Sequence, residues 1–402
     1  MRTGRIEEFE SLRGLMALWV LLGHVTLTFT PPRSLDSVAW RLLGANTKPV
    51  DVFIILSGFV VFNLLSRGRE SYRRYIARRF LRLFPAYLVC LLISLAMLPV
   101  TYAANVGLHP VTARTLERVA IIGAGLAQFW PHVLAHLTML HGAVPARMLP
   151  LTDYVFLGQA WSISVEWQFY LIAPLLLWLA TMRRRLVGLG LLAALCAGVF
   201  HARLAFGSGF IGAHVGYFAL GCCSFFVWQA DRRWPALLAR HATLAIPAAC
   251  AAWIVLLPQE WPGAIWIAVL LSCITVSLPN PCYLARAISA ALHMSALRWL
   301  GRISYSLYLT HMIALNAILW LLRDAGLAPL PMILTTGAGT LLITLLAADL
   351  LHRWVEAPFI SLGRRLPDRW FPARLRIPAT GRGSVGRPPV ASVSGNSASA
   401  PG

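Results

Sequence analysis

The sequence predicts an all-α, polytopic membrane protein, and three observations lead to that prediction. Apolar residues make up 58% of the 402 residues and charged residues only 12%, against about 25% charged residues in typical soluble domains. The mean hydropathy is +0.68, so a soluble fold would lack the polar surface needed to cover its core. The apolar residues are also gathered into long runs, which favours helices of about 20 residues that cross a bilayer.

Ten apolar runs have the character of spanning helices. In chain order they cover residues 12–29, 52–65, 84–102, 160–182, 186–205, 211–229, 243–257, 263–278, 299–322 and 331–352. A further apolar segment, 119–140, also contains a Gln, a Pro and two His residues, and a full crossing there would place the basic residues 183–185 outside. This segment is therefore predicted to be a re-entrant or interfacial helix.

The distribution of Arg and Lys predicts which side of the membrane each loop faces, because basic residues are enriched in cytoplasmic loops. With the N-terminus in the cytoplasm, 27 of the 35 Arg and Lys residues fall on the inner side and 8 on the outer side. Both termini are therefore expected in the cytoplasm. Residues 366–402, rich in Pro, Gly, Ser and Ala, are expected to be a disordered cytoplasmic tail.

Charge and composition also limit the partners. The net charge of +20 fits anionic lipid headgroups or a phosphorylated substrate, and the sequence has no nucleic-acid-binding motif. The seven Cys lie mostly in apolar runs without a CxxC spacing, and the His residues show no metal-ligand grouping. Neither nucleic acid nor a metal ion is an expected partner, and any chemistry is expected within the membrane bundle.

The first span carries an Arg and a His that share one helical face. His24 follows Arg13 by eleven positions, so the two side chains fall within about 20° of each other and about 16 Å apart along the helix axis. An Arg at the cytoplasmic mouth can bind phosphate, and a neutral imidazole deep in a cavity can take a proton from a hydroxyl. The alternative is an Arg that reaches the headgroups and a His that hydrogen-bonds within the bundle.

Two carboxylates in later spans are candidates for orienting that imidazole. Asp51 is expected near the outer interface, on the same side as His24, where a carboxylate would select the tautomer of the ring. The alternative for Asp51 is a helix N-cap. Glu166 lies in the first two turns of its span among Ser and Gln residues, which is too polar for packing alone. It is predicted to be a functional carboxylate, or else a protonated one satisfied by its neighbours.

Three arginines precede the third span at helical spacing. Arg78, Arg79 and Arg82 stand three or four residues apart or adjacent, so their guanidinium groups could converge on one helix face near the membrane. Such a cluster suits a nucleotide-type polyphosphate, because guanidinium binds phosphate oxygens bidentately. The alternative is a belt of positive charge on the lipid headgroups.

A polar stripe crosses the span 299–322. Tyr305, Tyr308 and His311 recur at i,i+3 spacing, so they share one face of an otherwise apolar helix. Polar groups at membrane depth are costly and point to a functional surface.

Taken in order, these motifs resemble those of the acyltransferase 3 family of multi-span membrane acyltransferases. The match is dispersed over about residues 12–365 and rests on five motifs. They are an Arg-x10-His (Arg13, His24), an Asp-x5-Ser-Gly-Phe (Asp51, Ser57, Gly58, Phe59), an Arg-Arg-x-x-Arg (Arg78, Arg79, Arg82), a Trp-Ser-x3-Glu-x2-Phe-Tyr (Trp161, Ser162, Glu166, Phe169, Tyr170) and a Gly-x2-Ser-Tyr-x2-Tyr-x2-His (Gly301, Ser304, Tyr305, Tyr308, His311). The departures are Trp167, where many members have a second Glu, and Pro49, where many have Gly.

The resemblance implies that residues 1–365 form a membrane acyltransferase domain. Its activity would move an acyl group, often acetyl, from cytoplasmic acyl-coenzyme A (acetyl-CoA in the acetyl case) to a hydroxyl. The implied catalytic residues are His24 as general base with Asp51 and Glu166. The implied donor-binding residues are Arg13, Arg78, Arg79 and Arg82. The candidate substrate-binding residues are Ser57, Trp161, Ser162, Tyr305, Tyr308 and His311.

Acceptors in this family include surface polysaccharides, lipid-linked sugars and macrolides, and a glycan or lipid-linked sugar is the expectation preferred here. The expected location is the bacterial inner membrane, in contact with the lipid bilayer, with the oligomeric state left open. The competing class is a transporter or exporter of an acylated metabolite or glycan precursor, since intramembrane His, Asp and Glu also suit proton relays. Against it, the sequence shows no paired halves with corresponding broken helices. A catalytically inactive scaffold is disfavoured, because every motif residue is present.

Overall fold

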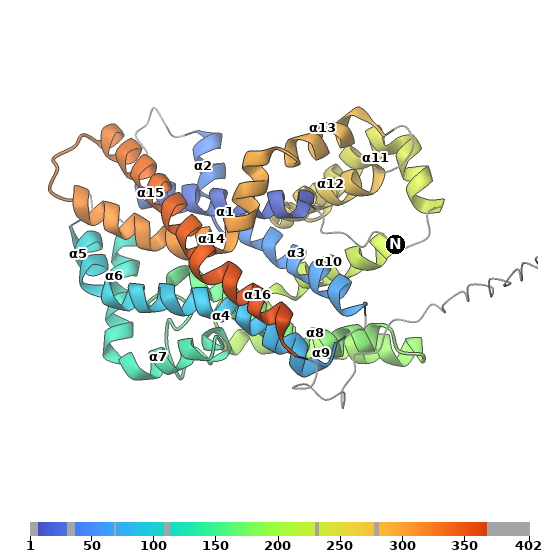
Figure 1. Ribbon diagram of the computed structural model, residues 1–402, viewed down its shortest axis with the longest axis horizontal. Helices are drawn as coiled ribbons and strands as arrows, with labels where there is room; N and C mark the ends of the chain where they lie inside the picture. Colours follow the sequence, from blue (N-terminus) through green and yellow to red (C-terminus); the bar gives the residue numbers. More distant parts are fainter. Residues whose placement is uncertain are drawn as a thin grey trace, which may run out of the picture.

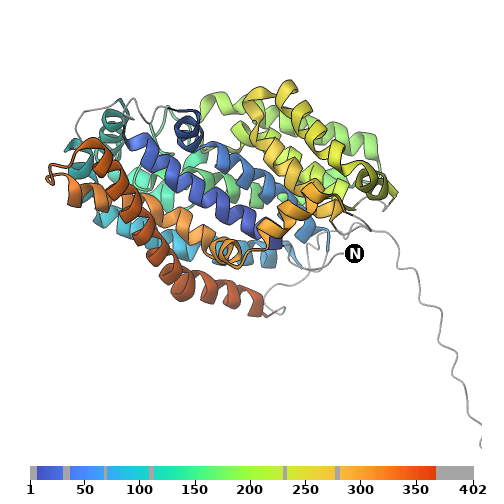
Figure 2. The same cartoon turned by 90° about the horizontal axis from the view of Figure 1, so that it is seen from above.

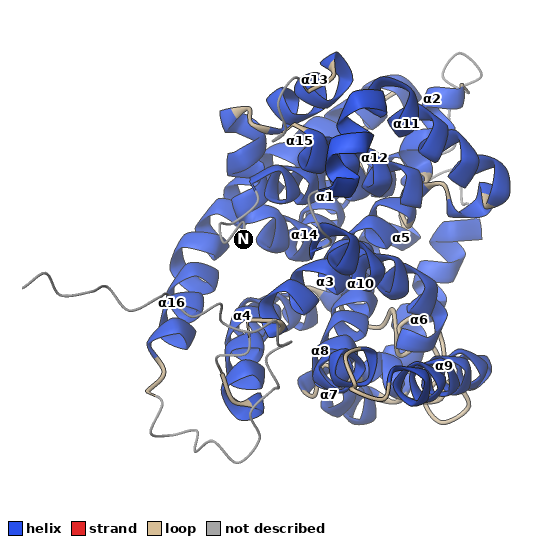
Figure 3. Cartoon of the chain, turned by 90° about the vertical axis from the view of Figure 1, so that its right-hand side faces the viewer, coloured by secondary structure: helices blue, strands red, loops and turns tan. Residues whose placement is uncertain are grey.

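The computed structural model describes residues 7–29, 37–67, 70–107, 113–229, 233–276 and 281–367. Within these ranges every regular element is a helix (Figure 3), which confirms the all-α class. The predicted disordered tail, 366–402, lies outside the described residues from position 368 onward.

The described residues form sixteen α-helices, and the longest described connection is the segment 138–160 between α7 and α8. The first eight are α1 (Glu7–Thr28), α2 (Val38–Gly44), α3 (Lys48–Leu65), α4 (Tyr72–Ala96), α5 (Leu98–Val106), α6 (Ala113–Ala127), α7 (Phe129–Leu137) and α8 (Trp161–Ala180). The others are α9 (Arg185–Ala202), α10 (Val215–Gln229), α11 (Arg233–Leu256), α12 (Pro262–Thr275), α13 (Tyr283–Leu292), α14 (Ser295–Leu322), α15 (Pro329–Leu351) and α16 (Ala357–Arg365). Single 3₁₀ turns are η1 (His141–Ala143), η2 (Gly158–Ala160), η3 (Arg203–Ala205), η4 (Ile211–His214) and η5 (Pro258–Glu260), and the π-helical turn η6 (His352–Glu356) joins α15 to α16.

Eight helical segments of the described chain are long and apolar enough to cross a membrane. They are Glu7–Thr28, Lys48–Leu65, Tyr72–Ala96, Gly158–Ala180, Arg185–Ala205, Ile211–Gln229, Ser295–Leu322 and Pro329–Arg365, and together they account for eight of the ten predicted runs. The other two runs, 243–257 and 263–278, lie in α11 and α12, whose apolar parts are shorter. The chain is thus a multi-pass membrane protein, because backbone at membrane depth is stable only in such hydrogen-bonded helices.

The segment predicted to be re-entrant contains a sharp break between α6 and α7 (Figure 1). The two helices together are apolar enough for one span, but their axes meet at 94°. Gln128 separates them with a non-helical backbone, and Pro131 follows in the first turn of α7, where a proline is tolerated. A re-entrant segment and a broken span both have this geometry, so the re-entrant interpretation stays a prediction.

α1, drawn in dark blue, lies in the middle of the helical bundle (Figure 2). It packs against α14, α3 and α15. A Cβ on Gly14 would lie 2.6 Å from the backbone nitrogen of Gly301, and a Cβ on Gly301 would overlap the carbonyl oxygen of Glu10. These two glycines therefore let α1 and α14 approach backbone to backbone, as small residues do at helix crossings in membranes.

Reporter fusions test the predicted orientation. Fusions after Arg74 and Arg184 should report the cytoplasm, because both positions lie in arginine-rich segments, and a fusion after Lys48 should report the exterior. Paired reporters that are active on opposite sides of the membrane provide the readout. An exterior location for Arg184 would make α6 and α7 a full crossing and would contradict the predicted orientation of the spans that follow.

Candidate active site

His24 lines a cavity of about 310 Å³. Its Nε2 is 3.0 Å from the amide nitrogen of Asn46, and its Nδ1 is buried without a hydrogen-bond partner in the described part of the chain. The ring lies 5.1 Å, centroid to centroid, from the ring of His311 on α14, whose Nε2 is likewise unpartnered there. Two neighbouring imidazoles thus each have one unpartnered ring nitrogen among the described residues, and of the two rings His24 lines the cavity.

Asn46 orients the His24 ring from the short loop between α2 and α3. Its approach depends on Gly23, because a Cβ on Gly23 would lie 2.6 Å from the Cβ of Asn46. A side-chain amide carries both a donor and an acceptor, so Asn46 can pair with Nε2 in either protonation state. With the amide nitrogen donating to Nε2, as here, a neutral ring carries its proton on Nδ1. Turning the Asn46 amide by about 180° lets its oxygen accept from Nε2–H, and Nδ1 then keeps the lone pair that a general base needs. Asn46 was not predicted as a site residue, because an Asn in a loop has no sequence spacing that relates it to a helix.

The structure corrects the expectation that Asp51 orients His24. Asp51 lies inside the first turn of α3, which begins at Lys48, so it is not the N-cap residue either. Its carboxylate accepts a hydrogen bond from Tyr217 of α10 and lies near Lys48 and Glu260. The side chain therefore faces α10, and Asn46 takes the position beside His24.

Glu166 does not contact His24 either, and lies at a second, narrower cavity of about 40 Å³. Its carboxylate accepts hydrogen bonds from Ser57, at 3.1 Å, and from Tyr170. Arg13 lines the same cavity and interacts electrostatically with Glu166. Hydroxyl donors and a nearby guanidinium thus stabilise this carboxylate at the Arg13 end of α1. A catalytic role for Glu166 or for Asp51 stays a prediction.

The narrow and the wide cavity adjoin along one face of α1. Val50 and Tyr308 line both cavities, while Arg13 lines the narrow one and His24 the wide one. The helical spacing predicts this shared face. The narrow cavity, at about 40 Å³, has room for a few water molecules and is much smaller than the wide one, at about 310 Å³, so a ligand arm that reaches through it has to widen it.

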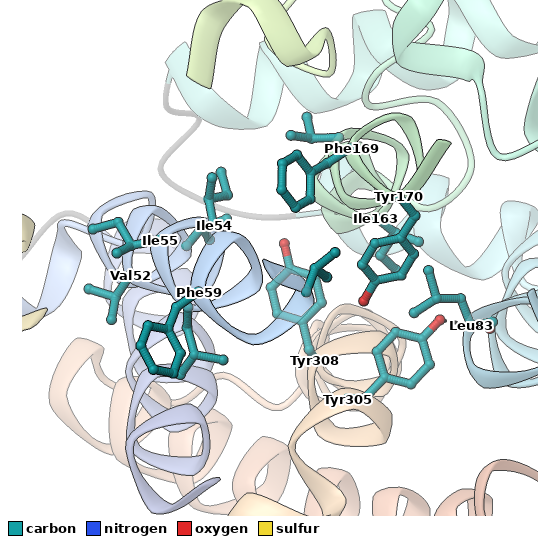
Figure 4. Close-up of a cluster of buried hydrophobic side chains, with 14 of the residues drawn as sticks. Val52, Ile54, Ile55, Phe59, Leu83, Ile163, Phe169, Tyr170, Tyr305 and Tyr308 are labelled. Carbon is teal, nitrogen blue, oxygen red and sulfur yellow. Dashed lines mark hydrogen bonds between the residues drawn. The ribbon is translucent and has the colours of Figure 1, made fainter. Parts of the chain in front are cut away.

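The tyrosine stripe of α14 lies among α3, α4 and α8 (Figure 4). Tyr308 donates to the carbonyl oxygen of Gln159, at 2.9 Å, and accepts from Ser162, at 2.8 Å. Tyr305 donates to the carbonyl oxygen of Leu83, at 2.7 Å. Both rings and Ser162 line the narrow cavity. These hydrogen bonds hold α14 against α8 and α4, so the stripe both shapes the cavity and connects the helices around it.

The predicted arginine cluster divides within α4. Arg78 forms an ion pair with Glu70, at 2.7 Å, so the expectation that all three guanidinium groups converge does not hold for Arg78. Arg79 is only 8% exposed, and its guanidinium lies 5.5 Å from the ring centre of Tyr170. Arg82 also interacts electrostatically with Tyr170. Arg79 and Arg82 thus face the helix that carries Glu166, and a phosphate-binding role for them stays a prediction.

The wide cavity is lined by amides, aromatic rings and a small group of charged residues. The amide side chains belong to Asn46, Asn105, Gln159 and Asn316. The aromatic side chains belong to Tyr154, Phe156, Trp161 and Tyr308. Burial raises the pKa of Tyr154, so its phenol stays protonated near neutral pH and can donate a hydrogen bond. Amides and ring faces together suit a ligand that is rich in hydroxyl groups.

The charged residues of the wide cavity are Arg114, Glu117 and Arg118 of α6. In the sequence the two arginines counted only among the basic residues of the outer side. Arg114 and Arg118 stand at i,i+4, a spacing that places both on one helix face. The i,i+4 spacing of the two arginines can be read from the sequence, but the cavity that they line is formed mainly by other helices.

Three further histidines are buried together. His136 stacks on His141 with ring centroids 4.1 Å apart, and the hydroxyl of Tyr87 lies 2.8 Å from Nδ1 of His136. His132 on the same helix is also buried. Among the residues that the structure describes, no group of three or more His, Cys, Asp or Glu side chains is arranged to hold a metal ion. The cluster is therefore not assigned to a metal.

Comparison with known proteins agrees with the motifs. Peptidoglycan O-acetyltransferase OatA of Listeria monocytogenes is 27% identical over 292 residues, which cover 65% of this chain and 44% of that protein. Putative peptidoglycan O-acetyltransferase YrhL of Bacillus subtilis is 26% identical over 294 residues, or 65% of this chain and 43% of that protein. Acyltransferase MdmB of Streptomyces mycarofaciens is 26% identical over 184 residues, or 46% and 41%. The chain thus spans less than half the length of these curated relatives, and no solved structure matches it.

The family comparison covers much more of the chain. The acyltransferase 3 family model, described as an acyltransferase domain, matches residues 6–351, which include every helix that lines the two cavities. The five motifs lie on α1, α3, α4, α8 and α14, and these helices meet around Arg13, Glu166 and Tyr308. This chain belongs to the acyltransferase 3 family.

Proposed function

We propose that this protein is a membrane O-acyltransferase that moves an acyl group, acetyl in the first instance, from acyl-coenzyme A to a hydroxyl of a carbohydrate. The observation that carries the proposal is the free Nδ1 of His24, at a cavity that adjoins the Arg13 cavity past Tyr308. The names of two relatives, both peptidoglycan O-acetyltransferases, support a carbohydrate acceptor. The proposed location is the bacterial inner membrane.

His24 acts as the general base in this proposal. Its Nδ1 takes the proton of the acceptor hydroxyl, the hydroxyl oxygen bonds to the thioester carbonyl carbon, and the carbon–sulfur bond breaks. The released thiolate takes this proton from the His24 imidazolium, which returns the base to its neutral form and balances the step. Asn46 holds the ring through Nε2, so that Nδ1 stays directed at the reacting hydroxyl. Direct transfer begins with this proton removal, whereas transfer through a covalent acyl-enzyme would need it in the second half-reaction, when the acceptor hydroxyl attacks the enzyme-bound acyl group.

The donor enters from the inner face in this proposal. Arg79 and Arg82 offer guanidinium groups to the phosphates of coenzyme A, and the acyl-bearing arm follows the face of α1 from Arg13 toward His24. The narrow cavity of about 40 Å³ has to open for that arm. Tyr308, which lines both cavities, stands at the point where the two substrates meet.

A thiol-release assay tests the proposal. The purified full-length protein, reconstituted in lipid vesicles, receives acetyl-CoA on one side and a soluble peptidoglycan glycan on the other. We expect free coenzyme A thiol to appear in proportion to acetyl ester on the glycan, because bond cleavage and transfer are one reaction. Glycan or acetylated glycan that crosses the vesicle wall without thiol release would instead identify a transporter and would overturn the proposal.

A further inference from the structure

The wide cavity contains an arginine pair that the acyl-transfer chemistry does not use. Arg114 and Arg118 line it together with one carboxylate, that of Glu117, so the charged groups of the lining carry one net positive charge. Nε of Arg114 and Nη2 of Arg118 are buried and make no hydrogen bond in the described part of the chain. A buried guanidinium donor without a partner is costly. The unfilled positions on these two arginines therefore favour a ligand with anionic oxygen atoms.

Arg118 is held in place by neighbouring helices. Its Nη1 lies 3.5 Å from the side-chain oxygen of Asn105 on α5, and the Asn105 amide donates to the side-chain oxygen of Asn316 on α14, at 3.3 Å. Both amides also line the cavity. Such a network reduces the entropy that the guanidinium loses on binding a ligand. The Arg118 guanidinium at the cavity wall is thus held in place before a ligand arrives.

The arginine pair lies close to the proposed general base. Arg118 interacts electrostatically with both His24 and His311, and Arg114 interacts with His24. An anion bound here would sit beside the reacting hydroxyl, on the same molecule. The amides and aromatic rings of the same lining suit the sugar that carries that hydroxyl.

From these contacts we propose that Arg114 and Arg118 form an acceptor subsite for an anionic sugar, one that bears a carboxylate or a phosphate close to the hydroxyl that is acylated. The proposal rests on the proposed function, because it takes the wide cavity as the site of the acceptor. Guanidinium groups bind carboxylate and phosphate with the same planar fork. The arginine pair therefore predicts an anionic group on the sugar, and the experiment distinguishes a carboxylate from a phosphate.

Binding of four small sugars, measured without any acyl donor, tests the subsite. The ligands are methyl glucoside, methyl glucuronoside, the methyl ester of that glucuronoside and glucose 1-phosphate. Saturation-transfer NMR on the full-length protein in detergent reports their relative affinities. We expect the glucuronoside or the phosphate to bind about tenfold or more tightly than the ester and the neutral glucoside, as a charge-assisted contact predicts. Tighter binding of the glucuronoside would identify the anionic group as a carboxylate, and tighter binding of glucose 1-phosphate would identify it as a phosphate.

Two variants assign the preference to the arginine pair. Arg118→Gln removes the charge but keeps amide donors, and it should reduce the ratio of anionic to neutral affinity to about one. Arg147→Gln removes one positive charge at an exposed position outside the cavity and should leave the ratio unchanged. Glu117→Gln should increase the ratio, because it removes the carboxylate that competes with the ligand.

Four outcomes would overturn the subsite. They are equal binding of the glucuronoside and its ester, no detectable binding of any of the four sugars, an unchanged ratio in Arg118→Gln, and loss of acyl-coenzyme A binding in that variant. Loss of acyl-coenzyme A binding in Arg118→Gln would show that this arginine binds an anionic group of the donor rather than of the sugar. Because the sugars are measured without a donor, failure of the thiol-release assay bears on acyl transfer alone. A retained preference for anionic sugars would then leave the subsite standing.

Discussion

Replacing His24 with alanine is expected to lower the rate of acyl transfer by about 100- to 10,000-fold, the usual contribution of a general base. The reason is geometric: His24 offers a free, buried Nδ1 at the cavity wall, and its Nε2 is already held by Asn46. Binding of acyl-coenzyme A should stay close to the wild-type value, because the proposed phosphate contacts lie at Arg79 and Arg82. Single-turnover thiol release and a donor titration on the same preparation measure the two quantities separately.

His201 provides the matched control. It lies in the last turn of α9, is exposed and lines neither cavity, so His201→Ala should transfer acyl groups at the wild-type rate. A His24→Ala variant that keeps near-wild-type turnover would remove this imidazole from the mechanism. In that case the neighbouring His311, whose Nε2 also lacks a hydrogen-bond partner among the described residues, would become the next candidate.

The second large effect is expected at the crossing of α1 and α14, where Gly301→Ala should destabilise the protein by about 1–3 kcal/mol. The added Cβ would overlap the carbonyl oxygen of Glu10. This is a backbone atom, so it cannot relieve the clash by changing rotamer as a side chain can. The helices must then separate, which also changes the 5.1 Å spacing of His24 and His311. Thermal unfolding in detergent and the rate of acyl transfer should therefore fall together.

A glycine-to-alanine substitution at Gly198 should instead stabilise the protein. Gly198 lies in α9, is exposed, and a Cβ there would meet no atom within 4 Å. Alanine in a helix interior is more favourable than glycine by about 0.5–1 kcal/mol, so Gly198→Ala should raise the unfolding temperature slightly. Equal effects of the two substitutions would show that the close approach of Gly14 and Gly301 does not limit the packing of α1 on α14.

Much of the architecture could be predicted from the sequence, because the membrane leaves the backbone few choices. An apolar run in lipid has to satisfy its hydrogen bonds within the segment, and a single helix does so. Eight of the ten predicted runs are accordingly long apolar helices. Periodicity within one helix is equally predictable, and it correctly places Arg13 and His24 on one face along two adjoining cavities.

The partners of the site residues could not be predicted in this way. A carboxylate was predicted to contact His24, whereas Asn46 makes that contact and Asp51 accepts a hydrogen bond from Tyr217. Arg78 was predicted to join Arg79 and Arg82, whereas it forms an ion pair with Glu70, eight residues earlier. Each of these errors concerns a contact between elements, and the pattern within one element carries no information about which side chain of another will face it.

The sequence by itself determined the helical membrane class, the family motifs and the residue types available for acyl transfer. Only the tertiary structure decided that His24 meets Asn46 and His311, and that α5, α6 and α14 bring Arg118, Asn105 and Asn316 to the same cavity. The physical reason is that local periodicity determines the face on which a side chain lies. Close approach of backbones at glycine, as where α1 crosses α14, determines which faces meet.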